Sequence, residues 1–566
     1  MKKMTDRKTT GKKADMVLKN GVVYTVDKQR SQAEAVAVCS KEIVYVGSTE
    51  KVADYIGPQT EVIDLAGKMM LPGFVDSHAH ASASINEDDG AMLYGLETKE
   101  DYVSALKGFA EKHPDLSVIY GGGWNNEVFP PQGPVKEDLD AVVSDRPVSL
   151  MSHDGHSIWV NSRALDMAGI TRDTPCPNGG MIETDRATGE PSGTIRETAR
   201  DLVQNVLPPY SVEQMKTGIR EFMVEASRVG ITTVHDPMLL LSESDGMLNG
   251  YGAARNSISA YDELVERREM TIRARGTILT DPTKGASQVP ALHAACSDHK
   301  DPLFQITGAK VFIDGVVEGG TAYLYEPYAH KPDFRGEPLW EQEPLNALFQ
   351  AVDAQGLQIH IHAIGDAAIC MSLDALSYAK DNNGSRDSRH LITHLQVVDY
   401  ADIPRFAELG IIGVPQPFWH VKGEYFWGLE AKYLGRERAE KEYPMKSFHD
   451  AGVILAGASD YPVQVPSPPL VGIMLGVLRC IPGDPDPNEI LGPQERMTLP
   501  DMIAAYTINS AYANFVEKET GSIEVGKKAD LVVLERNLFD IPTEEIGDVK
   551  VLMTMFEGKA VQRGSL

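Results

Sequence analysis

The feature that most constrains the fold is a series of eight short apolar segments separated by amphipathic helical stretches. The segments are residues 73–80, 230–237, 272–279, 306–315, 357–366, 390–396, 411–417 and 453–460. Strands that alternate with helices predict a parallel sheet, and eight such units are what a (β/α)8 barrel requires. We therefore predict an α/β protein whose centre is a TIM-type barrel formed by residues 67–84 and 212–519.

The remaining residues fall into three further parts. Residues 14–66 and 520–566 both consist of short alternating apolar runs separated by turn residues, and neither is long enough to bury a core alone. We expect these two chain ends to form one small composite β-sandwich. Residues 85–211 follow the first strand, are too many for a loop, and predict an inserted subdomain. Residues 1–13 are predicted to be a basic, flexible tail.

Composition excludes several classes of partner. The chain has 54 Lys and Arg against 81 Asp and Glu, a net charge of −27, which repels nucleic acids and anionic membranes. It lacks an apolar run of the ~18 residues that cross a bilayer, and its basic start lacks the apolar segment of a secretory signal. Five scattered cysteines without a CxxC pair favour a reducing compartment. We expect a cytoplasmic protein without nucleic-acid or membrane partners; a homodimer is one option for its assembly.

Residues of the types that bind metals stand at the ends of several predicted strands. His78 and His80 are two positions apart on the first strand, so both side chains project to one face and can grip one ion. Four further strands offer Lys310, His362, His394 and Asp460. The carboxyl ends of barrel strands meet at one rim, where barrel enzymes place their catalytic residues. We therefore predict that these side chains converge there around a metal.

Long motifs are similar to those of a known family. They run from about residue 14 to 561 and include LPGFVDSHAH, DGHSIWVNSRAL, GGMIETDRATGEPSGTIRE, KVFIDG, HIHAIGDAA, THLQ, GASDYPV and GSIEVGKKADLVVL. The chain resembles the amidohydrolase superfamily, most closely its YtcJ-like branch, which includes N-substituted formamide deformylases. The resemblance implies a metal-dependent hydrolase with a barrel and a small composite β-sandwich.

Matched residue by residue, the resemblance also implies which side chains hold the metal. The implied ligands are His78, His80, His362, His394 and Asp460. Lys310 matches a fourth-strand lysine that can take up CO2 as a carbamate and so bridge two metals.

Two of these positions carry alternatives. A free ammonium group beside divalent cations would be repelled, so a carbamate is the better form for Lys310. The alternative is that Lys310 forms an ion pair with Asp314, in which case the site could still bind one metal. His360 shares a strand face with His362 and lies one step deeper in the barrel. We favour a packed histidine that supports the site over a further ligand at His360.

The residue types point to hydrolysis. Imidazole and carboxylate ligands suit zinc, as one ion or two, and also allow iron or manganese. Such a cation lowers the pKa of its bound water from roughly 15.7 to about 7, so hydroxide is available at neutral pH. Asp460 would be the general base that accepts the proton of the attacking water and passes it to the departing amine. The expected reaction is cleavage of a non-peptide, amide-type C–N bond, for example in an N-formyl or N-acyl compound.

Aromatic residues give the clue to the substrate. Trp124 and His156 lie in the inserted segment, whereas Trp340 and Trp419 follow barrel strands, where loops form the rim of the active site. We predict these four as substrate-binding residues around a small molecule with an apolar or aromatic part. The alternative is that the aromatic side chains only seal the insertion onto the barrel.

Other functions remain open. A nucleobase-type deaminase on this barrel places Glu three residues after the fifth-strand histidine, where this chain has Gly365. An ester or lactone hydrolase could use the same barrel and hydroxide. A non-catalytic binding protein would keep the fold, but loss of activity usually erodes metal ligands, and every expected ligand is present here.

Overall fold

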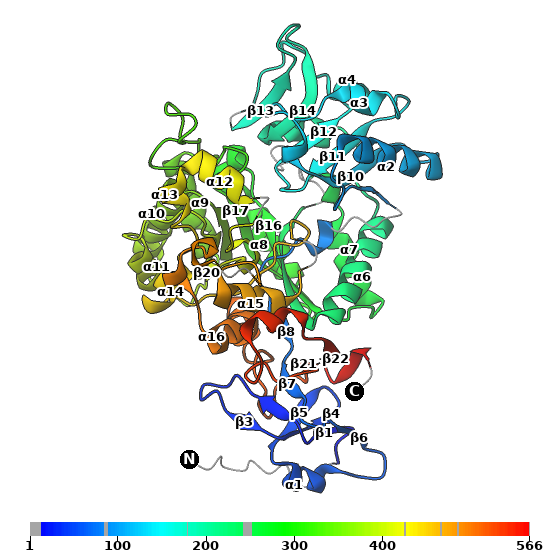
Figure 1. Ribbon diagram of the computed structural model, residues 1–566, viewed down its shortest axis with the longest axis vertical. Coiled ribbons are helices and arrows are strands. Elements are labelled where there is room, and N and C mark those ends of the chain that lie inside the picture. Colours follow the sequence, from blue (N-terminus) through cyan, green and yellow to red (C-terminus); the bar gives the residue numbers. More distant parts are fainter. Residues whose placement is uncertain are drawn as a thin grey trace.

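The computed structural model describes residues 13–83, 89–177, 179–241, 252–423, 426–464, 467–483 and 486–564. Three parts follow one another along the long axis: the inserted segment, a helix-rich centre, and a β-rich part built from both chain ends (Figure 1). The tail predicted at residues 1–13 lies outside the described residues except for Lys13.

The centre is built on a parallel sheet of seven strands in the order β20-β19-β18-β17-β16-β15-β8. The strands are β8 (Phe74–Asp76), β15 (Ile231–Leu239), β16 (Arg273–Leu279), β17 (Phe304–Phe312), β18 (Gln358–Ala363), β19 (Leu391–His394) and β20 (Ile412–Val414). Buried apolar side chains of these strands and of the helices outside them form the largest core. The predicted α/β architecture is confirmed.

The predicted eighth strand, residues 453–460, differs from a regular strand. It forms one parallel bridge, between Gly413 and Leu455. Backbone hydrogen bonds nevertheless join the segment to both edges of the sheet. Examples are the bond from Ala456 N–H to Gly413 O on β20 (2.9 Å) and the bond from Ser77 N–H after β8 to Gly457 O (3.1 Å). Asp460 has a positive φ of 61°, so the chain leaves the extended conformation before a ladder could continue.

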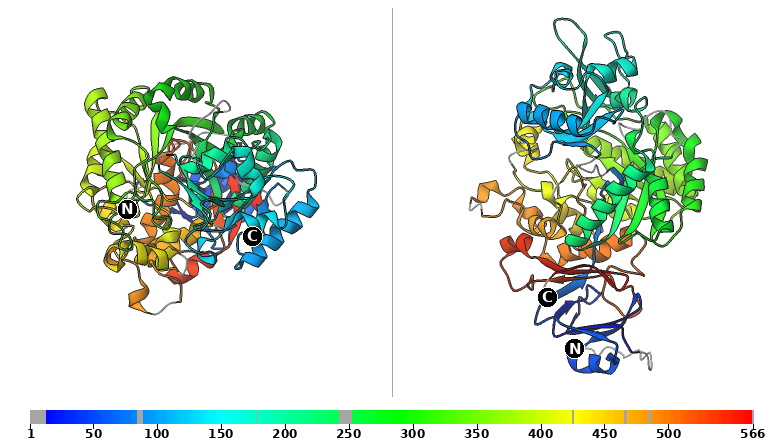
Figure 2. Two further views of the ribbon diagram at one scale, coloured as in Figure 1. Left: turned by 90° about the horizontal axis from the view of Figure 1, so that it is seen from above. Right: turned by 90° about the vertical axis from the view of Figure 1, so that its right-hand side faces the viewer.

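Helices cover the outside of the central strands (Figure 2). They are α6 (Val212–Arg228), α7 (Ser257–Glu266), α8 (Val289–Asp298), α9 (Gln342–Ala354), α10 (Asp366–Asn383), α11 (Ile403–Leu409), α14 (Met445–Asp450), α15 (Pro469–Leu478), α16 (Leu499–Ala504) and α17 (Ser510–Ala513). Two further helices, α12 (Phe426–Leu434) and α13 (Arg436–Ala439), instead pack against the loop after β17, in a separate apolar cluster that includes Val317, Leu434 and Ala439. In the part that the structure describes, no helix has the length and apolar character needed to cross a bilayer.

Helix α6 illustrates why these segments form helices. Ser211 and Gln214 make a capping box, in which Ser211 Oγ accepts from the Gln214 N–H (3.2 Å) and Gln214 Oε1 accepts from the Ser211 N–H (3.0 Å). The side chains of Met215, Ile219 and Phe222 follow at helical spacing and are buried in the central core. The helix is therefore fixed at its start and along one face.

Both chain ends contribute to the β-rich part. One sheet has the order β5-β4-β1-β6 and the other β23-β22-β21-β7-β2-β3. The strands are β1 (Met16–Lys19), β2 (Val22–Tyr24), β3 (Gln32–Ala33), β4 (Ala35–Cys39), β5 (Glu42–Gly47), β6 (Glu61–Asp64), β7 (Met69–Pro72), β21 (Leu531–Leu534), β22 (Val551–Phe556) and β23 (Lys559–Arg563). A short helix, α1 (Thr49–Val52), follows β5. Leu18 from one end and Met553 from the other share one apolar core.

Strand β7 lies within the range assigned to the barrel, but it pairs with β21 and β2 of the end sheet. The reason is that side chains on its two faces are buried in two different apolar cores. Met69 and Leu71 are buried in the central core, and Met70 is buried in the core of the chain ends. The predicted boundary at residue 67 is therefore placed too early.

The inserted segment has its own sheet, in the order β13-β14-β12-β11-β10-β9. Its strands are β9 (Ala91–Met92), β10 (Ile119–Trp124), β11 (Val148–Ser152), β12 (Ser157–Val160), β13 (Gly180–Thr184) and β14 (Pro191–Glu197). Its helices are α2 (Lys99–Lys112), α3 (Lys136–Asp140), α4 (Ser162–Ala168) and α5 (Asp201–Gln204). Two apolar cores, one around Trp124 and one around Ile195, lie within this segment.

Candidate active site

The side chains predicted to bind metal meet at the rim where the parallel strands end. Ladder register pairs Lys310 with His360 and Ala363 with His394 on neighbouring strands. A buried pocket of about 50 Å³ is lined by His78, His80, Lys310, His362, His394 and Asp460. All six side chains are buried. The structure thus brings together all six predicted metal ligands.

Asp460 occupies the middle of this group. Its Oδ1 lies 3.0 Å from His80 Nε2 and 3.2 Å from His78 Nε2. Its Oδ2 lies 4.0 Å from His394 Nδ1. Ligand atoms that sit ~2.0–2.2 Å from one zinc ion are separated from each other by roughly 3–4 Å. One ligand atom each of His78, His394 and Asp460 lies within 4.8 Å of the other two, so the spacing of these three side chains suits a shared cation.

Two of these residues hold strained backbone conformations. His394 has φ 75° and Asp460 has φ 61°, in the left-handed region that residues other than glycine rarely adopt. Such a conformation costs about 1–3 kcal/mol and persists only where the surroundings enforce it. The Asp460 N–H is fixed by a hydrogen bond to His78 O (2.8 Å). The fold thus holds the carboxylate in place at a cost in stability, which is typical of functional sites.

Charge states in the pocket suit metal binding. Burial alone would raise the pKa of Asp460, but the His80 hydrogen bond and the nearby positive charges outweigh it and lower this pKa to about 2. Burial also holds the pKa values of His78 and His394 well below their ordinary range. At neutral pH Asp460 is therefore ionised and the imidazoles of His78 and His394 are neutral, which are the forms that bind metals.

Lys310 is buried without a partner. Its side chain is fully buried, and its Nζ has no hydrogen-bond partner in the described part of the chain and lies 4.7 Å from the centre of the Phe312 ring. Burial lowers the pKa of Lys310 to about 7. Asp314 instead accepts the backbone N–H groups of Tyr323, Ile364 and Gly365 at 2.8, 3.0 and 2.9 Å. The alternative of a Lys310–Asp314 ion pair is therefore not what the structure forms.

His360 supports the pocket from below and does not line it. His360 Nε2 lies 2.8 Å from His78 Nδ1, and His360 Nδ1 lies 3.2 Å from His235 Nε2. The chain of contacts ends at Asn514 Oδ1, 2.8 Å from His235 Nδ1. Such contacts fix the ring of a ligating histidine. The sequence analysis missed His235 and Asn514. The position of His235 in the predicted second strand is a local signal that could have found it, whereas no local pattern marks Asn514.

The inserted segment contributes a charged pair. His156 lines the pocket, and its Nδ1 lies 2.9 Å from Glu197 Oε2. Burial disfavours charge on both groups, but their mutual attraction prevails, so the pKa of Glu197 falls to about 2 and that of His156 rises. Thr321 of the central part donates to Glu197 Oε1 (2.7 Å). Asp154 also lines the pocket. The sequence analysis missed Glu197 and Asp154, although each stands in one of the long motifs and Asp154 is two positions before His156.

Of the four predicted substrate-binding residues, two line the pocket and two do not. His156 and Trp419 line the pocket, and the Trp419 ring stacks on His394 with centroids 5.8 Å apart. The prediction for Trp124 is wrong because its ring is buried inside the inserted segment, where its N–H donates to Leu150 O (2.8 Å). The prediction for Trp340 is wrong because its ring, 3% exposed, packs in the central core.

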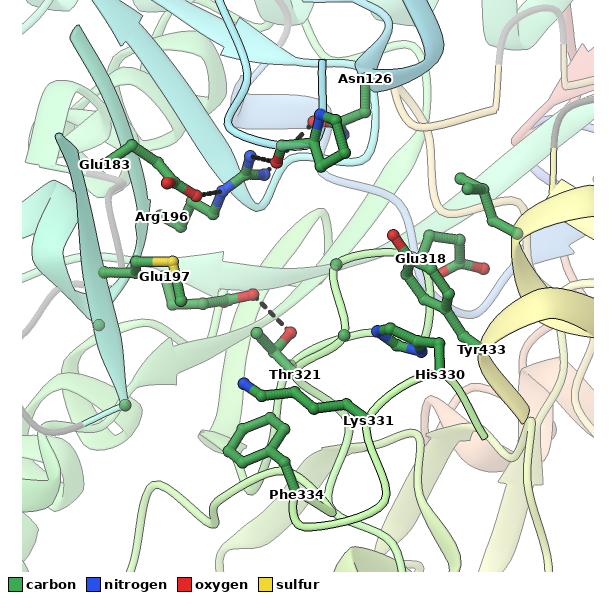
Figure 3. Close-up of a pocket in the computed structure, with 18 of the residues that line it drawn as sticks. Asn126, Glu183, Arg196, Glu197, Glu318, Thr321, His330, Lys331, Phe334 and Tyr433 are labelled. Atoms are coloured by element: carbon green, nitrogen blue, oxygen red, sulfur yellow. Dashed lines mark hydrogen bonds and ion pairs between the residues drawn. The ribbon is translucent and has the colours of Figure 1, made fainter. Parts of the chain in front are cut away.

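A larger cavity of about 710 Å³ lies next to this pocket. Figure 3 shows Arg196 and Glu197 of the inserted segment facing Glu318 and Lys331 of the central loops across it. Glu318 lines both this cavity and the metal pocket. We infer that a substrate reaches the pocket through this cavity, because the cavity lies between the inserted segment and the central part and shares Glu318 with the pocket.

Two buried carboxyl groups lie behind the pocket wall. Gln396, which lines the pocket, donates through Nε2 to Glu430 Oε1 and to Glu442 Oε1, both at 2.8 Å. Burial, together with the neighbouring carboxyl groups, raises the pKa values of Glu430 and Glu442 well above the ordinary value of 4.5. The folded protein therefore keeps protons there that the unfolded chain releases.

This arrangement predicts how stability varies with pH. Because the folded state keeps the Glu442 proton after the unfolded chain has lost it, the free energy of unfolding falls as the pH rises above about 4.5. Glu442→Gln removes this titration. In denaturant unfolding, we expect its stability relative to wild type to be greater at pH 8 than at pH 5. Glu437→Gln, at a side chain 90% exposed, is the control. Equal differences at both pH values would refute the expectation.

Comparison with known proteins agrees with this geometry. The sequence model of the amidohydrolase family matches residues 61–562. The putative amidohydrolase YtcJ of Bacillus subtilis (strain 168) is 32% identical over 550 residues, which cover 96% of this chain and 99% of that protein. Protein LONG AFTER FAR-RED 3 of Arabidopsis thaliana is 32% identical, with 96% and 91% covered. The N-substituted formamide deformylase of Arthrobacter pascens is 26% identical, with 96% and 97% covered.

A solved structure shows the same fold. An uncharacterized metal-dependent hydrolase from Pyrococcus horikoshii OT3 superposes with a TM-score of 0.72 at 21% identity, covering 93% of this chain and 99% of that one. The family match extends over most of the chain, from the end sheet through the metal pocket to the last strand. The chain therefore belongs to the amidohydrolase family.

Proposed function

We propose that this chain is a metal-dependent hydrolase that cleaves a non-peptide, amide-type C–N bond in a small molecule with an apolar or aromatic part. The observation that carries the proposal is the convergence of imidazoles, a buried lysine and the ionised Asp460 in one pocket. The similarity to a formamide deformylase over nearly the whole chain supports the choice of a C–N bond. The flat apolar ring of Trp419 in the pocket supports an apolar substrate.

The residues present fit a divalent cation. Neutral imidazoles and an ionised carboxylate suit zinc best, with iron or manganese as substitutes. We assign His78, His80, His362, His394 and Asp460 as the residues that would hold one or two ions. Lys310 joins them as a carbamate, formed when its neutral amine adds to CO2 and releases a proton. The buried Nζ of Lys310, unpartnered in the described residues, is the observation that favours this modification.

The bound cation would supply an activated water molecule and polarise the substrate carbonyl. Asp460 accepts a proton from the attacking water at a carboxylate oxygen and returns it to the nitrogen of the departing amine. His360 and His235 hold the His78 ring at the required angle. His156, whose pKa Glu197 raises, lines the same pocket and would donate a hydrogen bond to the oxygen of the scissile carbonyl.

The deaminase alternative requires a carboxylate three residues after His362. The chain has Gly365 there, and a Cβ at this position would lie 1.9 Å from Tyr323 O. The Gly365 N–H also donates to Asp314 Oδ2 (2.9 Å). This position therefore has no room for the side chain that a deaminase needs.

The proposal is tested with the zinc-loaded protein and a panel of N-formyl and N-acetyl amines, the corresponding esters, and the bases adenine and cytosine. We expect release of amine from the formamides or acetamides with a kcat/KM at least about tenfold above that for the esters, equivalent to 1.4 kcal/mol in the transition state. Ammonia release from the bases, or turnover of esters alone, would contradict it.

A further inference from the structure

A second cavity, of about 100 Å³, opens beside His80 between the inserted segment and the central rim. His80 and Val463 line both this cavity and the metal pocket, so a substrate at the metal can extend directly into it. We propose that this cavity is a subsite for a single hydroxyphenyl ring on one side of the scissile bond. The substrate class is then an N-acyl amine that carries one phenol ring, which rests on and deepens the proposed function.

The walls of the subsite are aromatic. Tyr120 and Tyr210 lie with ring centroids 4.8 Å apart, and Tyr94 packs edge-on against His153 at 5.4 Å. All four residues line the cavity, together with Met151 from β11. The cavity lining contains no Lys, Arg, Asp or Glu among the described residues. Such walls favour a neutral, flat group over a charged one.

Gly122 keeps this space open. It lies in β10 and lines the cavity, and a Cβ there would lie 3.4 Å from Met151 Cβ and 3.9 Å from Tyr94 Oη, both within ordinary contact distance. Replacement of Gly122 therefore narrows the cavity without a clash. A closed cavity of ~150 Å³ holds benzene, so a cavity of about 100 Å³ has room for no more than one ring and excludes fused rings.

Two of the lining residues, Gln204 and Tyr210, carry a buried polar atom that is left unpaired within the described ranges. Gln204, 2% exposed, donates through Nε2 to Ser149 Oγ (2.8 Å), which leaves its Oε1 without a partner in the described part of the chain. The buried Oη of Tyr210 also lacks a partner among those residues. An unpaired carbonyl and an unpaired hydroxyl together match a ligand hydroxyl, which donates to Gln204 and accepts from Tyr210.

The first test is direct binding of p-cresol and of toluene to the full zinc-loaded chain by isothermal titration calorimetry. We expect p-cresol to bind about tenfold more tightly than toluene, because only p-cresol satisfies the two unpaired atoms. Gly122→Ala should weaken p-cresol binding by about tenfold. The matched exchange Gly108→Ala, on α2 with open space around the added Cβ, should leave binding unchanged. Circular dichroism of each variant verifies folding.

The second test concerns the hydroxyl. Gln204→Leu should abolish the preference for p-cresol over toluene while toluene still binds. Absence of p-cresol binding to wild type, equal affinity for both probes, or binding unaffected by Gly122→Ala would each overturn the subsite. These binding measurements require no turnover, so they are independent of the hydrolase assay. Binding of p-cresol without amide cleavage would refute the proposed function alone. Amide cleavage without Gly122-dependent binding would refute the subsite alone.

Discussion

Asp460→Asn is expected to lower kcat by at least about 10³-fold while the protein remains folded. General acid–base catalysis alone contributes ~10²–10⁴-fold, and this carboxylate also stands between His78 and His80 at 3.2 and 3.0 Å, where it would hold the cation. Asparagine keeps the shape of the side chain and tolerates φ 61° better than other residues except glycine, so the backbone is preserved. The loss is therefore one of charge and proton transfer.

The measurement combines steady-state kinetics, metal content by atomic spectroscopy and thermal unfolding of the purified variant. His78→Ala removes a ligand from the same group and is expected to abolish turnover with loss of metal. Asp166→Asn, at an exposed position on α4, is the matched control and should behave as wild type. Full activity in either site variant would defeat the assignment of this pocket as the active site.

Removal of metal with a chelator is expected to abolish activity, and zinc together with bicarbonate should restore more of it than zinc alone. The physical reason lies in Lys310. Burial lowers the pKa of its amine to about 7, so a large neutral fraction is available near pH 7.5 to add to CO2, which bicarbonate supplies. The resulting negative charge would then be neutralised by the cation.

The bicarbonate effect has a specific control. Lys310→Met cannot form a carbamate, so its residual activity should rise with zinc and show no response to bicarbonate. Reconstitution with ¹³C-bicarbonate should give a carbamate carbon signal in wild type and none in the variant. If bicarbonate makes no difference in wild type and no such signal appears, the two-metal form of the site is wrong and a single-ion site remains.

The metal pocket could be predicted from the sequence because its residues carry local signals. His78 and His80 show the two-residue period of a strand, and His362 and Asp460 end apolar runs of strand length. Parallel strands then bring their carboxyl ends together whatever the length of chain between them. The positions of these side chains follow from topology, which is why distant residues could be grouped correctly.

Other parts of the site depend on packing that has no local pattern. Trp124 and Trp340 stand in turn-rich sequence that resembles an exposed rim, yet each ring is buried in a core. The contact of Glu197 with His156 joins the last residue of β14 to the loop before β12, and the pairing of β14 with β12 has no local signal in the sequence. The contact of Asn514 with His235 joins residues 279 positions apart. Only the folded chain defines such neighbours.

The two-faced strand β7 has a mechanical consequence. It is anchored to β21, near the end of the chain, and it runs through Gly73 into β8, which leads directly to His78. Only a few residues of backbone therefore separate the pairing of β7 with β21 from His78, so loss of that pairing should disturb the position of His78. The segment before His78 can therefore become rigid only after residues 531–534 have been synthesised and have paired with β7.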